Sequence, residues 1–316
     1  MNILVSGGAG FIGSEFIFQA VNSQVHKILV VDSLTYAGRK SNLVDLAGEI
    51  DFFQTDICNK GIMDEIFREN PIDYVVNFAA ESHVDNSIAN PDVFLETNVG
   101  GTLNLLKLSQ KYNVKKFLQV STDEVYGSIE TGLAKEHFPF NPSSPYSASK
   151  AAAEHFVNAA SKTHGLITSI VRCSNNYGPR QNPEKLIPLA INNLLNQRSV
   201  PVYGSGSNIR EWIHVSDCAR GILTVLENGS ANTTYNISSG NFKTNLEILS
   251  EILNVLSMPD DFLKFVEDRK GHDYRYAIDS SKIHNELGWK CIVNLNEGIA
   301  NTIEWYKYVG SDWLSK

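Results

Sequence analysis

The stretch NILVSGGAGFIGS, residues 2–14, decides the fold. An apolar run over residues 3–6 leads into glycines spaced G-x-G-x-x-G at Gly8, Gly10 and Gly13, and Gly7 gives the spacing G-x-x-G-x-x-G as well. Glycines permit a tight turn and let a pyrophosphate approach the backbone, where the N-terminus of the following helix attracts it. The stretch therefore predicts the first strand, turn and helix of a dinucleotide-binding domain, with a purely structural glycine turn as the alternative.

The next apolar run, KILVVD at residues 27–32, ends in an acid that selects the cofactor. Asp32 lies 19 residues after Gly13 (32 − 13). A carboxylate at this place accepts a hydrogen bond from the adenosine ribose and repels a 2′-phosphate, so we expect NAD and not NADP. Asp56, at the end of the third predicted strand, could reach the adenine, although a simple cap of the strand end is an alternative.

Short β-branched runs alternate with longer amphipathic stretches through the first half of the chain. The runs at 3–6, 27–32, 51–56, 74–80, 116–122 and 168–174 predict buried parallel strands, and 14–21, 92–112 and 145–163 predict helices. This alternation is typical of an α/β fold with a Rossmann-type doubly wound parallel sheet. We expect residues 1–174 to form it.

From about Asn175 the pattern becomes irregular. Short strands are predicted at 201–204, 234–238 and 276–279, and helices at 246–256 and 295–308. We expect residues 175–316 to form a smaller C-terminal α/β lobe for the substrate, with some later segments returning to the first sheet.

Composition limits the class of protein. Of 316 residues, 42% are hydrophobic and 20% charged, which is typical of a soluble globular protein, and the net charge of −8 argues against nucleic-acid or acidic membrane partners. Four widely spaced cysteines form no C-x-x-C, so we expect no metal site and a reducing, cytoplasmic setting. The N-terminus does not read as a signal peptide, and no apolar run has the length of a membrane span.

The run STDEVYG, residues 121–127, places Thr122, Asp123 and Glu124 directly after a predicted strand. Adjacent carboxyl groups can supply one acid and one base to the same small molecule. The alternative is a solvated pair of loop carboxylates. The neighbouring dinucleotide loop and tyrosine–lysine pair favour catalysis.

That pair lies in SPYSASK, residues 144–150. Ser144 and Pro145 suit a helix start, so Tyr146 and Lys150 fall at i and i+4 on one helical face. A nearby ammonium lowers a tyrosine pKa, and such a tyrosine can take the proton of a carbinol while hydride leaves for nicotinamide. An ordinary surface pair is the alternative. Together with the carboxylates, the pair predicts redox chemistry coupled to elimination of water.

Over nearly its whole length the chain resembles the dTDP-glucose 4,6-dehydratases, within the extended short-chain dehydrogenase/reductases that act on nucleotide sugars. The resemblance rests on motifs such as GGAGFIGS, NFAAESHVDNSI, SPYSASKAAAEH, NIREWIHVSD and DRKGHDYRYAID, and STDEVYG is the most specific of them. It implies that Tyr146 is the base at the C4 hydroxyl, Asp123 the acid at the C6 hydroxyl and Glu124 the base at C5. It further implies that Thr122 holds the C4 oxygen and that Lys150 binds the nicotinamide ribose.

Two sets of binding residues follow. We expect NAD to contact Gly7, Gly10, Phe11, Ile12, Gly13, Asp32, Ser33, Leu34, Thr35, Asp56, Ile57, Phe78, Ala79, Ala80, Ser82, Thr97, Tyr146 and Lys150. The resemblance implies that a nucleoside diphosphate sugar contacts Ser82, His83, Thr122, Asn175, Lys185, Leu186, Pro201, Val202, Tyr203, Arg210, Asn245, Asp268, Arg269 and His272.

Some of these assignments stay open at the level of sequence. Arg210 suits the diphosphate because a guanidinium can chelate phosphate oxygens, but an arginine in a loop can also be a solvated charge. His83 can equally be structural. Ser33, Asn86 and Asn182 depart from the family pattern, so dehydration of UDP-glucose or UDP-N-acetylglucosamine stays open.

The sequence leaves two alternative functions to weigh, and it predicts a homodimer. A nucleotide-sugar 4-epimerase of the same fold would leave the Asp123–Glu124 pair unexplained, and a non-catalytic NAD-binding protein would leave the tyrosine, lysine and carboxylates without a role. We also expect a homodimer built on the helices at 92–112 and 145–163, where small alanines allow close packing.

Overall fold

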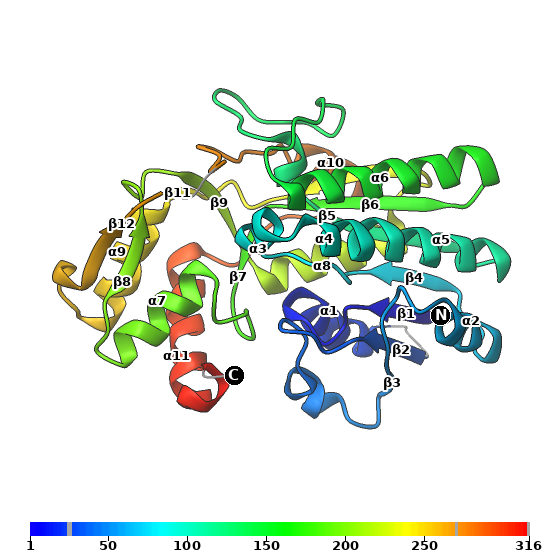
Figure 1. The fold of residues 1–316 in the computed structure, drawn as a ribbon, viewed down its shortest axis with the longest axis horizontal. Helices are drawn as coiled ribbons and strands as arrows, with labels where there is room; N and C mark the ends of the chain where they lie inside the picture. The colour runs from blue at the N-terminus through cyan, green and yellow to red at the C-terminus, as the bar shows by residue number, and fades with distance from the viewer. Residues whose placement is uncertain (24–26, 269–270, 315–316) are drawn as a thin grey trace.

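The computed structural model describes residues 1–23, 27–268 and 271–314. A larger α/β part carries the N-terminus, and a smaller part beside it contains α7 (Leu186–Leu195), α9 (Asn245–Leu256) and α11 (Leu295–Leu314) (Figure 1). The helices predicted at 246–256 and 295–308 are therefore confirmed as α9 and α11.

A seven-stranded sheet forms the centre of the larger part. Its order is β3 (Ile50–Gln54), β2 (Lys27–Asp32), β1 (Asn2–Ser6), β4 (Tyr74–Asn77), β5 (Lys116–Thr122), β6 (Thr168–Cys173) and β10 (Thr233–Ile237). Every neighbouring pair runs parallel. The predicted doubly wound parallel sheet is confirmed, and so are its first six strands.

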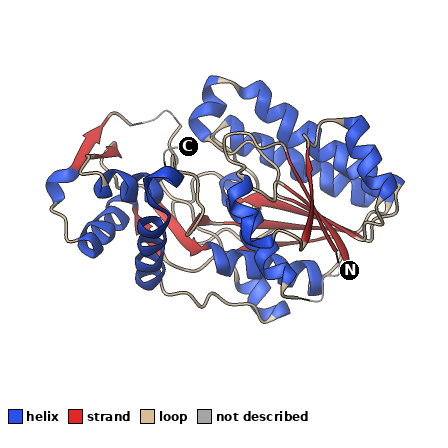
Figure 2. Ribbon diagram, turned by 90° about the horizontal axis from the view of Figure 1, so that it is seen from below, coloured by secondary structure: helices blue, strands red, loops and turns tan. Residues whose placement is uncertain are grey.

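Helices cover both faces of this sheet, which Figure 2 shows as a layer of strands between helices. Leu4, Leu29 and Phe117 pack with α2 (Lys60–Glu69), α5 (Thr102–Lys111) and α6 (Pro145–His164). Ile3, Val5 and other residues of opposite parity pack with α1 (Phe11–Val21), α8 (Val215–Asn228) and α10 (Ser281–Leu287). Burial on both faces explains why the strands are continuously apolar.

One prediction for the second half of the chain holds and one needs correction. The strand predicted at 234–238 forms β10 and pairs with β6, so it is a later segment that returns to the first sheet. The segment at 276–279 is not a strand. Ile278 makes an isolated bridge to Ala134, and the Tyr276 amide bonds to the Ile209 carbonyl, so the segment passes from one neighbour to the other without forming a ladder with either.

The smaller part has two short sheets. In one, β9 (Ile209–His214) lies between β7 (Asn175–Tyr177) and β11 (Phe242–Thr244). In the other, β8 (Val200–Tyr203) pairs with β12 (Leu263–Val266), which confirms the strand predicted at 201–204. The core between these strands and α7, α9 and α11 contains Tyr177, Ile191, Trp212 and Ile252.

The helix predicted over residues 92–112 is interrupted. The chain forms α3 (Val84–Ala89), α4 (Pro91–Phe94), a π-helical turn η2 (Leu95–Gly101) and then α5. Within η2, the Asn98 side chain bonds to the backbone of Glu81 and to Ser149 of α6. Such wide turns often occur at functional sites, and this one carries Thr97 to the cavity described below. In the described part of the chain, three 3₁₀ segments complete the fold: η1 (Lys40–Leu46), η3 (Asp123–Tyr126) and η4 (Asp260–Phe262).

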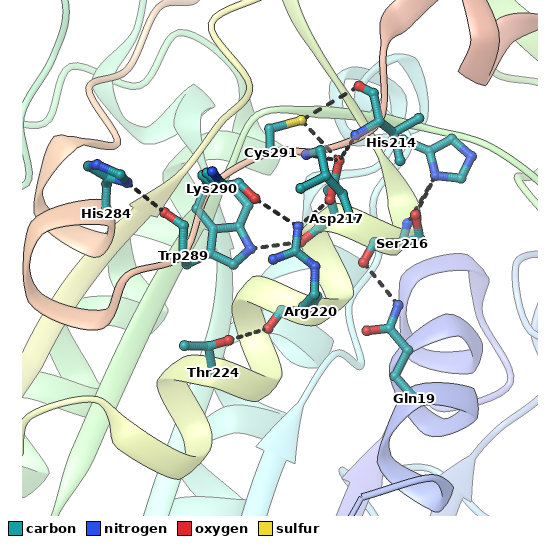
Figure 3. A network of polar contacts seen from close by, with 12 residues as sticks. Gln19, His214, Ser216, Asp217, Arg220, Thr224, His284, Trp289, Lys290 and Cys291 are labelled. Atoms are coloured by element: carbon teal, nitrogen blue, oxygen red, sulfur yellow. Dashed lines mark hydrogen bonds and ion pairs between the residues drawn. The ribbon is translucent and has the colours of Figure 1, made fainter.

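A polar network around Asp217 fastens the chain after α10 to the start of α8 (Figure 3). The buried Asp217 carboxylate accepts the backbone amides of Ile292 and Val293 at 3.0 and 2.8 Å and pairs with Arg220. The Trp289 indole donates to the Asp217 carbonyl at 3.2 Å. Residues far apart in sequence are thus held together at the point where β9 leads into α8.

Candidate active site

A cavity of about 330 Å³ opens at the carboxyl ends of β1, β2, β4, β5 and β6. Doubly wound sheets bind ligands at this edge, where the strand order reverses between β1 and β4. Its lining includes the glycine turn, Asp32, Tyr146 and the Thr122–Asp123–Glu124 run, so the fold brings the predicted motifs together.

The glycine turn is closely packed against its neighbours. Gly7 has φ +70°, and a Cβ there would lie 2.5 Å from the Ala79 nitrogen. A Cβ on Gly13 would collide with the Gly7 carbonyl oxygen. Helix α1 begins after Gly10, which provides no side-chain cap, so the first amides of the helix face the cavity as an anion site.

Asp32 is held firmly at the end of β2. Its carboxylate accepts the amides of Ala9 at 2.9 Å and Leu34 at 2.8 Å, and burial raises its pKa. Leu34 therefore acts through its backbone on Asp32, and its side chain does not line the cavity. A carboxylate fixed in this way presents its remaining lone pairs to a ribose.

All other residues predicted for NAD line the cavity. Several further lining residues escaped the sequence analysis: Val31, Ala37, Gly38, Thr55, Glu81, Val120, Ser121, Cys173, Ser174, Asn176, Gln181 and Asn182. Ser121 lies near the end of β5 and Ser174 directly follows β6, so the strand-end rule could have found both. Gly38 packs against the Asp32 carboxylate, a contact that no local pattern indicates.

The chemistry of this edge fits NAD. An uncapped helix N-terminus suits a pyrophosphate, and Asp32 suits an unphosphorylated ribose. Among the described residues, the hydroxyl oxygens of Ser121 and Ser174 are buried in the lining and have no hydrogen-bond partner. Buried polar atoms are normally paired, so these two indicate a polar ligand.

The carboxylate run follows directly from the end of β5. The Thr122 hydroxyl donates to Asp123 Oδ1 at 3.3 Å and accepts the Glu124 amide at 3.2 Å, which starts η3. Asp123 is 3% exposed, and within the described chain its Oδ2 has no partner. Burial raises the pKa of Asp123 well above its usual value, and the charges of Glu124 and Glu211 raise it further. A solvated loop pair is excluded for Asp123, because its carboxyl is buried in the cavity lining.

Tyr146 and Lys150 occupy the first turns of α6, which a capping box between Ser144 and Ser147 starts. Tyr146 is buried, and burial followed by the nearby Glu124 raises its pKa, while a hydrogen bond with the Thr122 side chain acts in the opposite direction. The Lys150 ammonium donates to the Val120 carbonyl at 2.7 Å, and burial lowers its pKa to about 8. The lowering of the Tyr146 pKa by Lys150 stays a prediction, and in this structure the lysine bonds to β5.

The residues predicted for the nucleotide sugar lie farther apart than those predicted for NAD, and only some of them line the cavity. Ser82, Asn175 and Lys185 line the cavity, and the Lys185 ammonium donates to the Ser82 carbonyl at 3.2 Å. His83 caps α3 through the Asn86 amide and lies 3.6 Å from Glu184. Outside the lining are Leu186, Pro201, Val202, Tyr203, Arg210, Asn245, Asp268 and His272, and Arg269 falls outside the described residues.

Arg210 is not an exposed loop charge. It is 3% exposed on β9, and its guanidinium donates to the backbone carbonyls of Ile209, Asp273 and Tyr274. The next residue, Glu211, is fully buried and accepts the amides of Gly240 and Ile278 at 2.6 and 3.3 Å. Burial raises the pKa of Glu211 to about 7. Neither environment follows from sequence spacing.

Comparison with known proteins agrees with this site. Residues 4–302 match the GDP-mannose 4,6 dehydratase family model. A dTDP-glucose 4,6-dehydratase from Actinoplanes is 44% identical over 99% of this chain and 100% of its own. The crystal structure of a dTDP-glucose 4,6-dehydratase from Streptomyces venezuelae with NAD bound is 45% identical, has a TM-score of 0.95 and covers 98% of this chain and 97% of its own.

A functionally different relative has nearly the same fold. UDP-glucose 4-epimerase from Thermotoga maritima, solved with UDP-glucose, is 30% identical with a TM-score of 0.92, covering 98% of this chain and 99% of its own. Fold alone therefore does not separate the two activities. The STDEVYG run, the buried Asp123 and the higher identity do, and the chain belongs to the dTDP-glucose 4,6-dehydratase family.

Proposed function

We propose that this enzyme converts dTDP-glucose to dTDP-4-keto-6-deoxyglucose by transient oxidation at C4 and loss of water across C5 and C6. The observation that carries the proposal is the buried Asp123 carboxyl beside Glu124 in the same cavity as Tyr146. An epimerase has no step that needs this acid and base. NAD, when bound, supplies the hydride acceptor for C4 and the hydride donor for C6.

Three residues carry out the oxidation at C4. Tyr146 takes the proton of the C4 hydroxyl, and Thr122, which shares a hydrogen bond with it, holds the C4 oxygen. The raised pKa of Tyr146 means that a phenolate needs a cation nearby. Lys150, one helical turn along α6, provides that charge and binds the nicotinamide ribose.

The two carboxyl groups have different roles in the elimination of water. A ketone at C4 acidifies the C5 hydrogen, which Glu124 removes as the base. Asp123, kept protonated by burial, gives its proton to the departing C6 hydroxyl. The acid and base are thus separated by environment, although they are adjacent in sequence.

The binding roles divide along the chain. Residues 1–174 hold NAD through the glycine turn and Asp32, and residues 175–316 hold the nucleotide sugar, apart from the segments that complete the first sheet. Bound-nucleotide analysis of the purified protein is expected to find NAD(H) and no NADP. Stoichiometric release of NADH with product would contradict the closed hydride cycle.

Substrate identity is tested by incubation with dTDP-glucose, UDP-glucose and UDP-N-acetylglucosamine, with product masses recorded. The expected result is loss of the mass of one water, fastest with dTDP-glucose. Faster turnover of a UDP sugar would reassign the base, and a product of unchanged mass with inverted C4 would favour the epimerase.

We also propose that the enzyme works in the cytoplasm as a homodimer built on the helical segments at 92–112 and 145–163. Val93 and Leu95 near α4 and Phe156 on α6 are exposed apolar side chains, and the small Ala152 and Ala159 flank Phe156 on α6 at helical spacing. In the described residues no helix is long and apolar enough to cross a membrane. Light scattering that gave the 35.0 kDa mass of one chain at micromolar concentration would refute the dimer.

A further inference from the structure

Tyr276 places a buried hydroxyl between two carboxylates at the edge of the active site. It is 4% exposed, and its hydroxyl donates to Asp273 Oδ2 at 2.9 Å. Glu124 Oε2, part of the proposed base, is 3.5 Å from the same hydroxyl. The tyrosine is therefore the link between the base and the 273–276 segment.

The position of the ring is fixed from two sides. The Arg210 guanidinium lies over the ring at 4.2 Å from its centroid and bonds to the Asp273 carbonyl at 2.9 Å. The Tyr276 amide donates to the Ile209 carbonyl at 3.2 Å. Because ring and backbone are both anchored to β9, the hydroxyl cannot move away from Glu124 without breaking these contacts.

The hydroxyl acts as a donor and not as a base. Burial and the nearby Glu124 raise the pKa of Tyr276, so it keeps its proton. It has one proton for two carboxylates, and rotation of the O–H bond alone decides which of them receives it. The Ser143 hydroxyl also donates to Asp273 Oδ2, so Asp273 keeps a donor when Tyr276 turns to Glu124.

We propose that Tyr276 is a positioning residue for Glu124: its hydroxyl fixes the rotation of this carboxylate for removal of the C5 proton. The inference rests on the proposed function, which assigns removal of the C5 proton to Glu124. Tyr276 touches neither substrate nor cofactor in this role and acts through Glu124. Oxidation at C4, which uses Tyr146, does not depend on it.

The test is Tyr276→Phe, which keeps the ring under Arg210 and removes only the hydroxyl. We expect kcat for dehydration to fall about 10- to 100-fold, the range for loss of one hydrogen bond to a charged group, with KM little changed. In rapid mixing of the NAD-loaded enzyme with dTDP-glucose, reduced nicotinamide should form at the wild-type rate and persist longer. The isotope effect of a C5-deuterated substrate on kcat should rise, because C5 deprotonation becomes slower.

The matched control is Tyr235→Phe. Tyr235 is also buried, and its hydroxyl donates to a carboxylate, Glu286, at 2.8 Å, but it lies on β10 beside α10. We expect this variant to keep wild-type kcat and isotope effect, so that general loss of a buried hydroxyl is separated from the effect on Glu124.

The outcomes separate the two proposals. A wild-type enzyme that removes no water from any nucleotide sugar refutes the proposed function. A wild-type enzyme that dehydrates, with Tyr276→Phe matching it in kcat and isotope effect, refutes only the role of Tyr276. Loss of the first hydride transfer in Tyr276→Phe also refutes that role, because it would show a general structural effect.

Discussion

Asp123→Asn provides the sharpest test of the division between acid and base. The amide has nearly the shape of the carboxylic acid and can keep the contact with the Thr122 hydroxyl, but it cannot deliver a proton to the C6 hydroxyl. General acid–base assistance is worth about 10²–10⁴-fold, or about 2.7–5.4 kcal/mol of barrier. Since Asp123 is 3% exposed, water cannot easily replace it as a donor, and we expect the upper half of that range, about 10³–10⁴-fold.

The assay is rapid mixing of NAD-loaded enzyme with dTDP-glucose, followed at the absorbance of reduced nicotinamide and by product mass. Asp123→Asn should show the first reduction at close to the wild-type rate and then almost no loss of water. Glu124→Gln should behave alike, since it cannot accept the C5 proton. Tyr146→Phe should instead suppress the reduction itself.

A control variant removes an unrelated charge. Glu130→Gln makes the same change as Glu124→Gln on an exposed loop residue a short distance along the chain, and it should turn over like wild type. If Asp123→Asn kept a kcat within about tenfold of wild type, below the range for general acid catalysis, Asp123 would not be the acid. The epimerase hypothesis would then be favoured over the dehydratase hypothesis.

Three further outcomes are expected. Gly13→Ala should abolish retention of NAD after gel filtration because its Cβ meets the Gly7 carbonyl, whereas Gly61→Ala, at an exposed position of α2 where the new Cβ meets only the Asn59 side chain at 3.8 Å, should retain it; equal retention would contradict the packing argument. Arg172→Met should lower the free energy of unfolding by about 3–5 kcal/mol, because it leaves Glu154 unpaired in the core. Adding Glu154→Gln should restore part of the lost stability. A urea unfolding midpoint that Arg172→Met leaves unchanged would count against the buried pair. Asp123→Asn should raise the Tm relative to wild type, with a gain that grows as the pH rises from about 4, the unfolded pKa, to the raised folded pKa. In this range the unfolded carboxyl ionises while the buried one keeps its proton, which costs wild type stability. A gain that shrinks with pH would refute the pKa direction.

The sheet was predictable because its signals are local. Continuous apolar runs such as KILVVD mark strands buried on both faces, and the glycines at 7–13 mark a turn that no larger residue can form. Tyr146 and Lys150 were predictable for the same reason, since a helix places i and i+4 on one face whatever surrounds it.

Contacts between distant segments were not predictable in this way. Residues 234–238 have the pattern of a short strand, and only the space beside β6 decides that they join the first sheet. Tyr276 and Glu211 gain their importance from neighbours about 150 and 30 residues away, Glu124 and Gly240. Single-sequence periodicity contains no information about such pairs. The same holds for Lys150, whose bond to Val120 links α6 to β5.

The different environments of Asp123, the proposed acid, and Glu124, the proposed base, follow from where β5 ends. A strand alternates its side chains across the sheet, but η3 begins at Asp123, and a 3₁₀ helix turns about 120° per residue. Consecutive carboxyl groups therefore point in different directions. Asp123 is buried, which raises its pKa, and Glu124 Oε2 lies 3.5 Å from the Tyr276 hydroxyl. If β5 continued by two residues, the Asp123 and Glu124 carboxyl groups would lie on opposite faces of the sheet. They could then not act on neighbouring carbons of one sugar.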